Sequence, residues 1–517
     1  MSTVADTTLD GRIAALAARD LPLAVGIVRE AVRVPADHVD RPEAEGGDPL
    51  CGLGNHEGPR MQFLRQALID IGAVASPDDV LVDWFGNLTW TLEDQPDGVP
   101  RSRKRVVYLD GHCDTVQAVR ARWTETTGVD PYLGAANGTP LRREALRREQ
   151  GWLPPDDEWE HLLFGLGAAD QLGGVAAMMV ASRILRELAP EGALRGVILR
   201  GIVTPAEEDN EGGGPAFLVQ RVLPGAPPDM LPDLVVLTEP SGDASAGALG
   251  IYRGQRGRVQ VEVTVTGRSS HGSVPAEGLN PLEHGGAILA EAALLAGAGA
   301  GLRDHPFLGP GTRTASAGAV ETPSNCAVPQ RFTFRFDRRL TAGEGAEQAV
   351  AEIEALESVR EARGAGLSVD VAVPRYEQPT WRGYAVSNPQ AYPAWLTPED
   401  HPAVGAAVAA YRAVVSPHVS AGGKGGALRS EPRVAPCPFS TNGVGYVVPA
   451  GDTSIDAPEY KRWVRSGDLR HPPMLVFGPG ILQNVHRMGE CLDTRELGHA
   501  IAFLARLPGL FAQEIVS

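Results

Sequence analysis

Histidine and carboxylate side chains occur at five places in the chain where an apolar run ends or an apolar helix begins. They are His112 with Asp114, Asp170, Glu207 with Glu208, Glu239, and His486. Oxygen and imidazole ligands without a thiolate are typical of hydrolytic rather than structural metal sites. The set therefore predicts a metal-dependent hydrolase.

In His112-Cys113-Asp114 the two polar residues stand two positions apart at the end of an apolar run. Residues two apart on a strand point to the same face. A metal-bound imidazole usually donates its other N–H to a carboxylate or carbonyl. The spacing favours His112 as a ligand with Asp114 behind it, and a strand-end histidine beside an exposed aspartate is the alternative.

Glu207 and Glu208 are adjacent, so their side chains point in different directions. One can bind metal while the other faces the attacking water as a general base. A solvated acidic turn that also includes Asp209 and Glu211 is the alternative.

Asp170 precedes an apolar helix, where aspartate is a common N-cap. It also follows Gly165-Leu166-Gly167, a flexible approach that would let the carboxylate reach inward and bridge two ions. We expect the bridging role.

Four apolar runs must position these side chains. They are residues 106–109, 197–203, 234–237 and 474–477, and polar residues follow the first three. Continuous apolar strands belong to parallel sheets covered on both faces, and ligands of such sheets gather beyond the carboxyl ends of the strands. We expect an α/β fold with a mostly parallel sheet covered by helices, whose loops converge on one site.

The pattern changes between the third and fourth runs. Apolar residues alternate over 259–265, 332–336 and 367–373, a weaker strand is expected over 314–321, and helices are expected over 281–296 and 344–362. The order β-α-β-β-α-β is that of the split βαβ sandwich, a ferredoxin-like α+β unit. We predict a catalytic domain made of residues 1–256 and 375–517, with residues 257–374 inserted as a second domain.

The composition excludes several functions. The chain has 517 residues, 43% of them hydrophobic, and a formal net charge of −17, which opposes binding to nucleic acid. We see no apolar stretch long enough to span a membrane and no secretory leader, so we expect a cytoplasmic protein without a membrane partner. Five scattered cysteines without a C-x-x-C pair indicate neither a disulfide framework nor a cysteine–zinc site.

Five motifs in order resemble the zinc metallopeptidase family that includes aminoacylase, acetylornithine deacetylase, succinyl-diaminopimelate desuccinylase and glutamate carboxypeptidase. They are Gly111-His112-Cys113-Asp114-Thr115-Val116, Gly167-Ala168-Ala169-Asp170, Glu207-Glu208, Thr238-Glu239-Pro240 and Val485-His486-Arg487-Met488-Gly489-Glu490. The resemblance implies two divalent ions, expected to be zinc with cobalt or manganese as alternatives. It assigns His112, Asp170 and Glu239 to one ion and Asp170, Glu208 and His486 to the other, with Glu207 as the general base and Asp114 orienting His112.

The inserted domain is similar to the lid and dimerisation domain of this family. Ser270-His271-Gly272-Ser273 resembles the segment whose histidine reaches the active site of the partner subunit, which implies a homodimer in which His271 stabilises the oxyanion. Asn325 and Arg339 resemble positions that hold a substrate carboxylate, and the planar fork of an arginine suits that task. A surface arginine is the alternative for Arg339.

Some details depart from the usual pattern. Gln171-Leu172 replaces Met-Lys after the bridging aspartate, and together with residues 252–257 and 337–341 this resembles the hydrolase branch associated with selenium metabolism. A charged insertion over residues 135–160, between two motifs, either shapes the pocket or is a surface helix with solvated charges.

The expected substrate is an N-acyl amino acid or a small peptide-like molecule, cleaved at its amide bond. Carbamoyl-amino-acid hydrolysis and a non-catalytic ligand-binding protein of the same fold are the alternatives.

Overall fold

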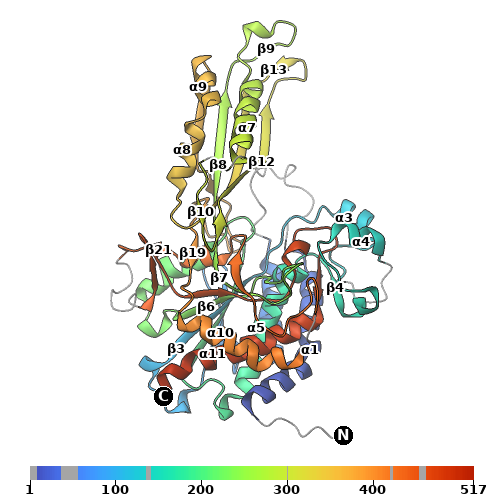
Figure 1. The fold of residues 1–517 in the computed structure, drawn as a ribbon, viewed down its shortest axis with the longest axis vertical. Helices are drawn as coiled ribbons and strands as arrows, with labels where there is room; N and C mark the ends of the chain where they lie inside the picture. The colour runs from blue at the N-terminus through green and yellow to red at the C-terminus, as the bar shows by residue number, and fades with distance from the viewer. Residues whose placement is uncertain are drawn as a thin grey trace.

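The computed structural model describes residues 8–36, 56–134, 141–297, 299, 301–419, 423–452 and 462–516. Figure 1 shows a broad unit that contains both ends of the described chain and an elongated unit that projects from it. We call the projecting unit the lid. Cys51 and residues 135–140 lie outside the described residues.

A nine-stranded sheet forms the centre of the broad unit. The four predicted runs are adjacent strands in this sheet, in the order β5 (Val197–Thr204), β3 (Arg105–His112), β6 (Leu234–Leu237) and β24 (Met474–Val476), and they pair in parallel. The α/β prediction is thereby confirmed.

The sheet is antiparallel towards both sides, which the sequence did not indicate. On one side lie β2 (Leu88–Glu93) and β1 (Val80–Val82), and on the other lie β7 (Ile251–Gln255), β19 (Trp395–Leu396) and β20 (Val434–Cys437). Of these, only β20 pairs in parallel, with β7. Parallel pairing is therefore confined mainly to the central strands that lead to the predicted site.

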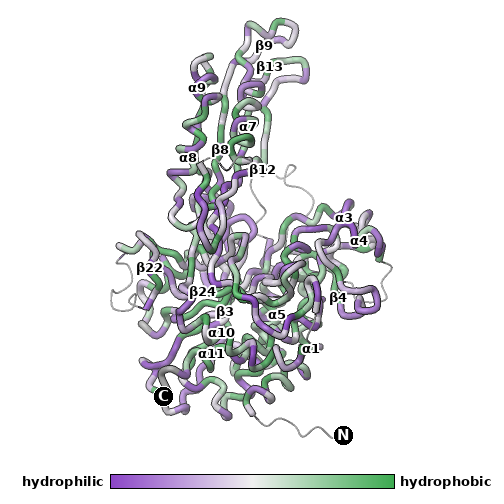
Figure 2. The backbone as a smooth tube through the Cα atoms, viewed as in Figure 1, coloured by the Kyte–Doolittle hydropathy of each residue, from purple (hydrophilic) through white to green (hydrophobic). Residues whose placement is uncertain are grey.

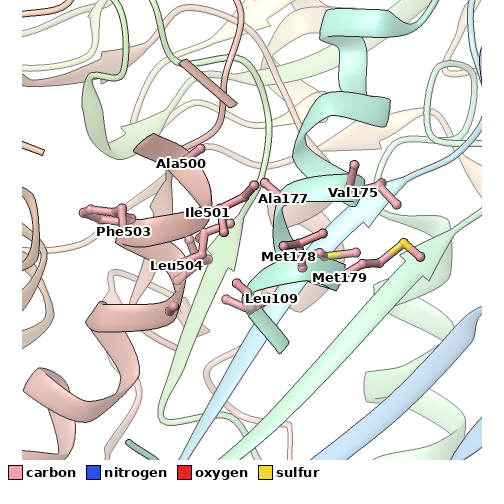
Figure 3. Packing of buried hydrophobic residues seen from close by; sticks show 14 of the residues in the cluster. Leu109, Val175, Ala177, Met178, Met179, Ala500, Ile501, Phe503 and Leu504 are labelled. Carbon is pink, nitrogen blue, oxygen red and sulfur yellow. The ribbon is translucent and has the colours of Figure 1, made fainter. Parts of the chain in front are cut away.

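Successive side chains of each strand point to opposite faces of the sheet, and helices cover one of these faces. Val107 and Leu109 of β3 belong to a core formed with α1 (Leu9–Val32), α2 (Gly58–Asp70), α5 (Gly174–Glu187), α10 (Pro402–Val414) and α11 (Thr494–Val516). Figure 3 shows Leu109 beside side chains of α5 and α11. Val106 and Tyr108 point to the opposite face, where the segment 218–223 and the segments around Tyr446 and Trp463 cover them.

The lid contains a second, antiparallel sheet. Its strands lie in the order β12 (Thr312–Glu321), β14 (Arg331–Leu340), β8 (Gly257–Thr266) and β15 (Ser368–Ala372), and β18 (Ala391–Tyr392) also pairs with β8. Helices α7 (Pro281–Gly297), α8 (Ala346–Glu354) and α9 (Glu357–Gly364) pack against it. This is the predicted split βαβ arrangement.

The helix predicted over residues 344–362 is two helices instead. Leu356 is extended (φ −63°, ψ 142°) and buries its side chain in the lid core, which interrupts the helix between α8 and α9. Glu344 lies outside the helix and accepts a hydrogen bond from the Thr341 amide. Tertiary packing thus overrides a sequence that is locally rich in helix formers.

The tip of the lid carries two short paired strands, β9 (Ser270–His271) and β13 (Ala327–Val328). Figure 1 shows them at the end of the lid that is farthest from the central sheet. Strand β12 is the edge of the lid sheet, and most of its side chains are exposed. An exposed edge strand can pair with another chain.

The insertion between the first two motifs forms a side unit (Figure 1). It contains α3 (Arg120–Thr127), α4 (Arg143–Glu149) and β4 (Leu162–Phe164), and β4 pairs with β25 (Cys491–Asp493). Figure 2 shows mainly hydrophilic colours over α3 and α4. The remaining short strands are β10 (Asp304–His305), β11 (Gly309–Pro310), β16 (Arg375–Tyr376), β17 (Asn388–Pro389), β21 (Val448–Pro449), β22 (Val464–Ser466) and β23 (Leu469–His471).

The four cysteines that the structure describes are unpaired: Cys113, Cys326, Cys437 and Cys491. In the described part of the chain, we find no helix with the length and apolar character needed to cross a membrane.

Candidate metal centre

Six ionisable side chains meet beyond the carboxyl ends of the central strands. His112 ends β3, Glu207 and Glu208 follow β5, Glu239 follows β6, Asp170 lies just before α5, and His486 lies between β24 and β25. The structure therefore brings together residues that the sequence separates by more than 370 positions, from His112 to His486.

His112 lies at the middle of the cluster. Its Nε2 is 3.0 Å from Oδ1 of Asp170, 3.8 Å from Oε2 of Glu207 and 3.8 Å from Oε1 of Glu239. Its side chain is buried. One imidazole nitrogen thus faces three carboxylates.

His486 approaches the cluster from the other side. Its Nε2 is 3.3 Å from Oδ2 of Asp170 and 3.1 Å from Oε2 of Glu208. The two oxygens of Asp170 therefore face different imidazoles, Oδ1 towards His112 and Oδ2 towards His486. This is the arrangement expected of a carboxylate placed between two cations.

Ligand atoms within 4.8 Å of one another form two groups among the described residues. One contains His112, Glu207 and Glu239, and the other contains His112, Asp170 and Glu208. Proximity alone does not separate a metal ligand from a general base, since Glu207 lies as close to His112 as Glu239 does. What distinguishes the two neighbouring glutamates is that Glu208 contacts His486.

Asp114 connects two parts of the cluster. Nδ1 of His112 lies 3.2 Å from the Asp114 carbonyl oxygen and 3.4 Å from its Oδ1. The carboxylate also accepts hydrogen bonds from the amides of Glu207 (3.0 Å) and Glu208 (2.9 Å). Asp114 thus contacts the His112 imidazole, as the predicted orienting role requires, and it also accepts hydrogen bonds from the Glu207-Glu208 turn, which the sequence did not predict.

Asp170 does not cap α5, whose N-cap is Gly173. Glu490 Oε1 accepts hydrogen bonds from the amides of Ala169 (2.9 Å) and Asp170 (3.0 Å), which fixes the backbone here. A Cβ on Gly174 would lie 1.9 Å from the carbonyl oxygen of Thr238, so glycine is needed for α5 to approach the end of β6. These contacts direct the Asp170 carboxylate into the cluster.

Gln171, which departs from the usual family pattern, contacts the end of the strand that carries His112. Its side-chain oxygen accepts a hydrogen bond from the backbone amide of His112. The unusual residue therefore supports the strand end that carries a predicted ligand.

Burial dominates the electrostatics of the centre. It raises the pKa of Glu207 and of Glu239 well above the ordinary value, because a charged carboxylate loses its hydration there. Burial also opposes ionisation of Asp170, but hydrogen bonds from His112 and His486 outweigh it and hold the pKa of Asp170 below the ordinary value. Four carboxylates can remain ionised together at this site only beside compensating positive charge.

The residues fit divalent metal ions. The donors are carboxylate oxygens and imidazole nitrogens, and Glu207 Oε1 is buried with no hydrogen-bond partner in the described part of the chain. A bound cation would supply the missing positive charge and the missing electrostatic contacts.

A pocket of about 240 Å³ opens onto the cluster. It is lined by Asp170, Glu207, Glu208, Glu211, Glu239, Arg258, Arg339, Phe439, Ser440, Leu482, Val485 and His486. Arg339 comes from β14 at the base of the lid and donates to both oxygens of Asp337, at 2.7 and 2.9 Å. The pocket is thus lined by both carboxylates and arginines.

Arg258 and Glu211 are pocket residues that sequence reasoning missed. Arg258 is the second residue of the lid strand β8, is buried, and has its Nε 3.0 Å from Glu211 Oε1. The sequence pattern indicates only an acidic turn for Glu211. The available signal was only that Arg258 follows the predicted domain boundary at residue 257, because the tertiary structure decides the burial of its side chain and its pairing with Glu211.

His271 and Asn325 lie at the tip of the lid, exposed, and neither lines the pocket. The Ser273 amide donates to Nδ1 of His271 at 3.2 Å, and the Ser273 hydroxyl oxygen is 2.7 Å from the same nitrogen. A neutral His271 that accepts at Nδ1 carries its proton on Nε2. The side chain therefore presents an N–H donor outward.

Comparison with known proteins places the chain in a family. The family model described as "Peptidase dimerisation domain" (M20_dimer) matches residues 253–363. The chain is 31% identical to the uncharacterized protein YgeY of Escherichia coli (strain K12) over 432 residues, which cover 83% of this chain and 85% of YgeY. It is 25% identical to acetylornithine deacetylase of Yersinia pseudotuberculosis serotype O:1b (strain IP 31758) over 222 residues, 40% of this chain and 45% of that enzyme.

Solved structures share the fold over nearly the whole chain. The di-peptidase Dug1p from Saccharomyces cerevisiae superimposes with a TM-score of 0.63 at 11% identity, covering 98% of this chain and 99% of Dug1p. YXEP of Bacillus subtilis, described as a dinuclear metal binding peptidase from the M20 family, gives a TM-score of 0.53 at 13% identity, covering 96% and 99%. The resemblance first seen in five motifs is confirmed, and the chain belongs to the M20 family of metallopeptidases.

Proposed function

We propose that this enzyme hydrolyses an amide bond with two metal ions, one held by His112, Asp170 and Glu239 and the other by Asp170, Glu208 and His486. The observation that carries the proposal is the position of Asp170, whose two oxygens face the two imidazoles. Zinc is the expected metal, with cobalt and manganese as alternatives. As a member of the M20 family the chain is a hydrolytic enzyme, which sets aside a purely ligand-binding role.

Glu207 is proposed as the general base. When bound, the two ions would polarise the substrate carbonyl and lower the pKa of water. Glu207 removes one proton from the attacking water and delivers it to the leaving nitrogen, so that the amide becomes a carboxylic acid and an amine. Its backbone is held by Asp114, whose carboxylate accepts its amide hydrogen bond, which keeps the side chain directed into the cluster.

The proposed substrate is an N-acyl amino acid or a small peptide-like molecule. Arg339 lines the pocket and already binds a carboxylate, Asp337, through two hydrogen bonds. We propose that a substrate carboxylate takes the same paired contact, and that Asn325, which lies at the lid tip with His271, adds a second contact from the other chain. The arginine fork provides both affinity and orientation.

A homodimer is part of the proposal. Residues 257–374 would form the dimerisation unit, consistent with the family match over residues 253–363. His271 would reach the pocket of the other chain and donate from Nε2 to the developing oxyanion, because in its own chain it lies at the lid tip, remote from the pocket.

Metal removal and a substrate panel test this function together. We expect chelation to abolish turnover and added zinc, cobalt or manganese to restore it, with two equivalents bound by elemental analysis. The panel should contain N-acyl amino acids, dipeptides and carbamoyl amino acids. Release of ammonia would identify carbamoyl hydrolysis instead of deacylation, and full activity of a metal-free preparation would refute the proposal.

A further inference from the structure

We infer that the segment 141–164 is a clamp that positions His486 for metal binding. The segment contains α4 and β4, and it contacts the loop 482–490, which carries His486. The inference rests on the proposed function, because it treats His486 as a ligand. It assigns a positioning role to an insertion whose sequence suggested either a pocket wall or a surface helix.

The loop needs external support. His486 has φ of +60°, a left-handed conformation that a residue with a Cβ adopts at an energetic cost. Its side chain is 48% exposed, so packing around the ring does little to hold it. The conformation that brings Nε2 to Asp170 and Glu208 must therefore be imposed by the residues on either side.

The first support lies two residues before His486. Asn484 is buried and forms two hydrogen bonds with the backbone of Trp152: its Oδ1 accepts from the amide at 3.0 Å, and its Nδ2 donates to the carbonyl oxygen at 2.7 Å. Gly151 packs so closely on Gln483 that a Cβ there would lie 2.3 Å from the Gln483 Cβ. The clamp thus contacts the loop through hydrogen bonds to the Asn484 side chain and through close packing on Gln483.

The second support lies one to three residues after His486. Gln150 is buried and donates from Nε2 to the Met488 carbonyl oxygen at 2.9 Å, and Arg487 donates to the Glu149 carbonyl oxygen at 2.8 Å. A Cβ on Gly489 would lie 2.2 Å from Leu146 Cδ2. His486 is therefore held between two sets of contacts with a single short segment.

The clamp has its own small core, which makes it rigid enough to impose a conformation. Leu146, Trp159, Leu162 and Phe164 pack with Cys491 of the neighbouring strand β25. The arginines of α4 are exposed on the outer surface, and no described residue of the segment lines the pocket. The charged run is thus solvated surface, whereas the buried polar residues of the segment contact the loop.

The consequence is a difference between the two metal positions. His112 and Glu239 lie at the ends of the central strands β3 and β6, and among the described residues their contacts do not include the clamp, whereas His486 depends on it. Loss of a group that orients a metal ligand weakens metal binding by about 10- to 100-fold. Weakening the clamp should therefore lower affinity for the ion held by His486 and leave the other ion bound.

The experiment is Co²⁺ binding to metal-free enzyme, followed by equilibrium dialysis with metal analysis and by visible absorption. Asn484→Ala removes both hydrogen bonds to Trp152. Gln150→Met removes one donor at nearly constant volume and is the milder variant if Asn484→Ala does not fold. Arg148→Gln, on the exposed face of α4, and Ile353→Val, in the lid core, serve as controls for the segment surface and for general destabilisation.

We expect the wild type and both controls to bind two equivalents of Co²⁺. The Gln150 and Asn484 variants should bind one Co²⁺ with unchanged affinity and the second about 10- to 100-fold more weakly. Two equally tight ions in both clamp variants would overturn the inference, and so would an equal loss of both ions. A wild type that binds fewer than two ions would instead refute the two-ion function, so the two failures are distinguishable.

Discussion

The metal centre and the lid tip hold their polar residues in opposite ways. In the centre, His112 and Asp170 are buried and contacted by residues distant in the sequence. At the tip, His271 and Asn325 are exposed, and His271 contacts Ser273 and, through backbone pairing, β13. The centre is assembled within one chain, whereas the tip presents a donor that has no target among the residues that the structure describes, as expected if its target belongs to a second copy.

The prediction with the largest expected effect tests which of the two adjacent glutamates is the general base and which binds metal. Glu207→Gln should retain both metal ions yet lose about 10²- to 10⁴-fold in turnover, because a general base is removed. Glu208→Gln should instead lose metal, because Glu208 contacts His486 and is proposed as its co-ligand. Elemental analysis beside steady-state kinetics separates the two results.

The two variants are each other's control, since they differ by one position in the same turn. Equal loss of metal in both would void the assignment of base and ligand.

The second prediction tests whether the tip acts on another chain. His271→Ala should lose about 10²- to 10³-fold in turnover, as expected for removal of an oxyanion donor. Mixing it with Glu207→Gln under conditions of subunit exchange should restore activity, because one site of each mixed dimer combines an intact Glu207 with an intact His271. With equal amounts and free exchange, about a quarter of all sites should be intact.

Subunit exchange must be shown independently, for example with differently tagged chains. If exchange is complete and no activity returns, His271 serves its own chain and the contrast between tip and centre is wrong.

The third prediction concerns the base of the lid, where the two regions meet. Arg339→Lys should raise KM about 10- to 100-fold with a smaller change in kcat, because a lysine cannot replace the paired contacts of the guanidinium to a carboxylate. Steady-state kinetics on the best substrate of the panel measures this. Arg335→Lys is the matched control, since Arg335 lies on the same strand and pairs with Glu262 outside the pocket.

An unchanged KM for Arg339→Lys, with Arg339→Ala equally unaffected, would remove Arg339 from substrate binding and leave it as a partner of Asp337 only.

The prediction with the smallest expected effect concerns the loss of folding stability at acidic pH, which we expect to arise from His471 in the broad unit. Burial lowers the pKa of His471 from 6.5 to about 4. Protonation therefore favours the unfolded chain, so this contribution is complete above pH 6.5 and is lost as the pH falls from 6.5 towards 4. At pH 5 the loss is about 2 kcal/mol by linkage.

Urea unfolding between pH 7 and pH 5 checks this. His471→Gln should flatten the pH dependence, whereas His161→Gln, with a side chain that is 40% exposed, should not. The same slope in both variants would show that His471 is not the group responsible.

Much of the centre was predictable because each strand and the polar residues that follow it are encoded by neighbouring residues in the sequence. A short apolar run predicts a buried strand wherever it occurs, and the polar residues at the end of such a strand lie at one edge of the sheet. The runs before His112, Glu207 and Glu239 became adjacent strands β3, β5 and β6 for this reason. The lid strands were equally readable, since Val259 to Val265 and Phe332 to Phe336 alternate with polar residues.

The contacts that hold these parts are not local. Glu490 accepts hydrogen bonds from the amides of Ala169 and Asp170, which are 321 and 320 positions away, and Gln150 donates to the Met488 carbonyl oxygen, 338 positions away. A glutamate or glutamine gives no sign in the sequence of which distant backbone group it will meet. The break between α8 and α9 is similar, because only the lid core decides that Leu356 is extended.

The sequence by itself determined which residue types could do chemistry, the strands that carry them and the family to which they belong, because strand pattern and motif order are properties of neighbouring residues. Only the tertiary structure decided that Asp170 lies between two imidazoles, that Arg258 pairs with Glu211 at the pocket, and that the insertion packs against the loop of His486. These depend on where distant backbones approach, which is set by packing of the whole fold.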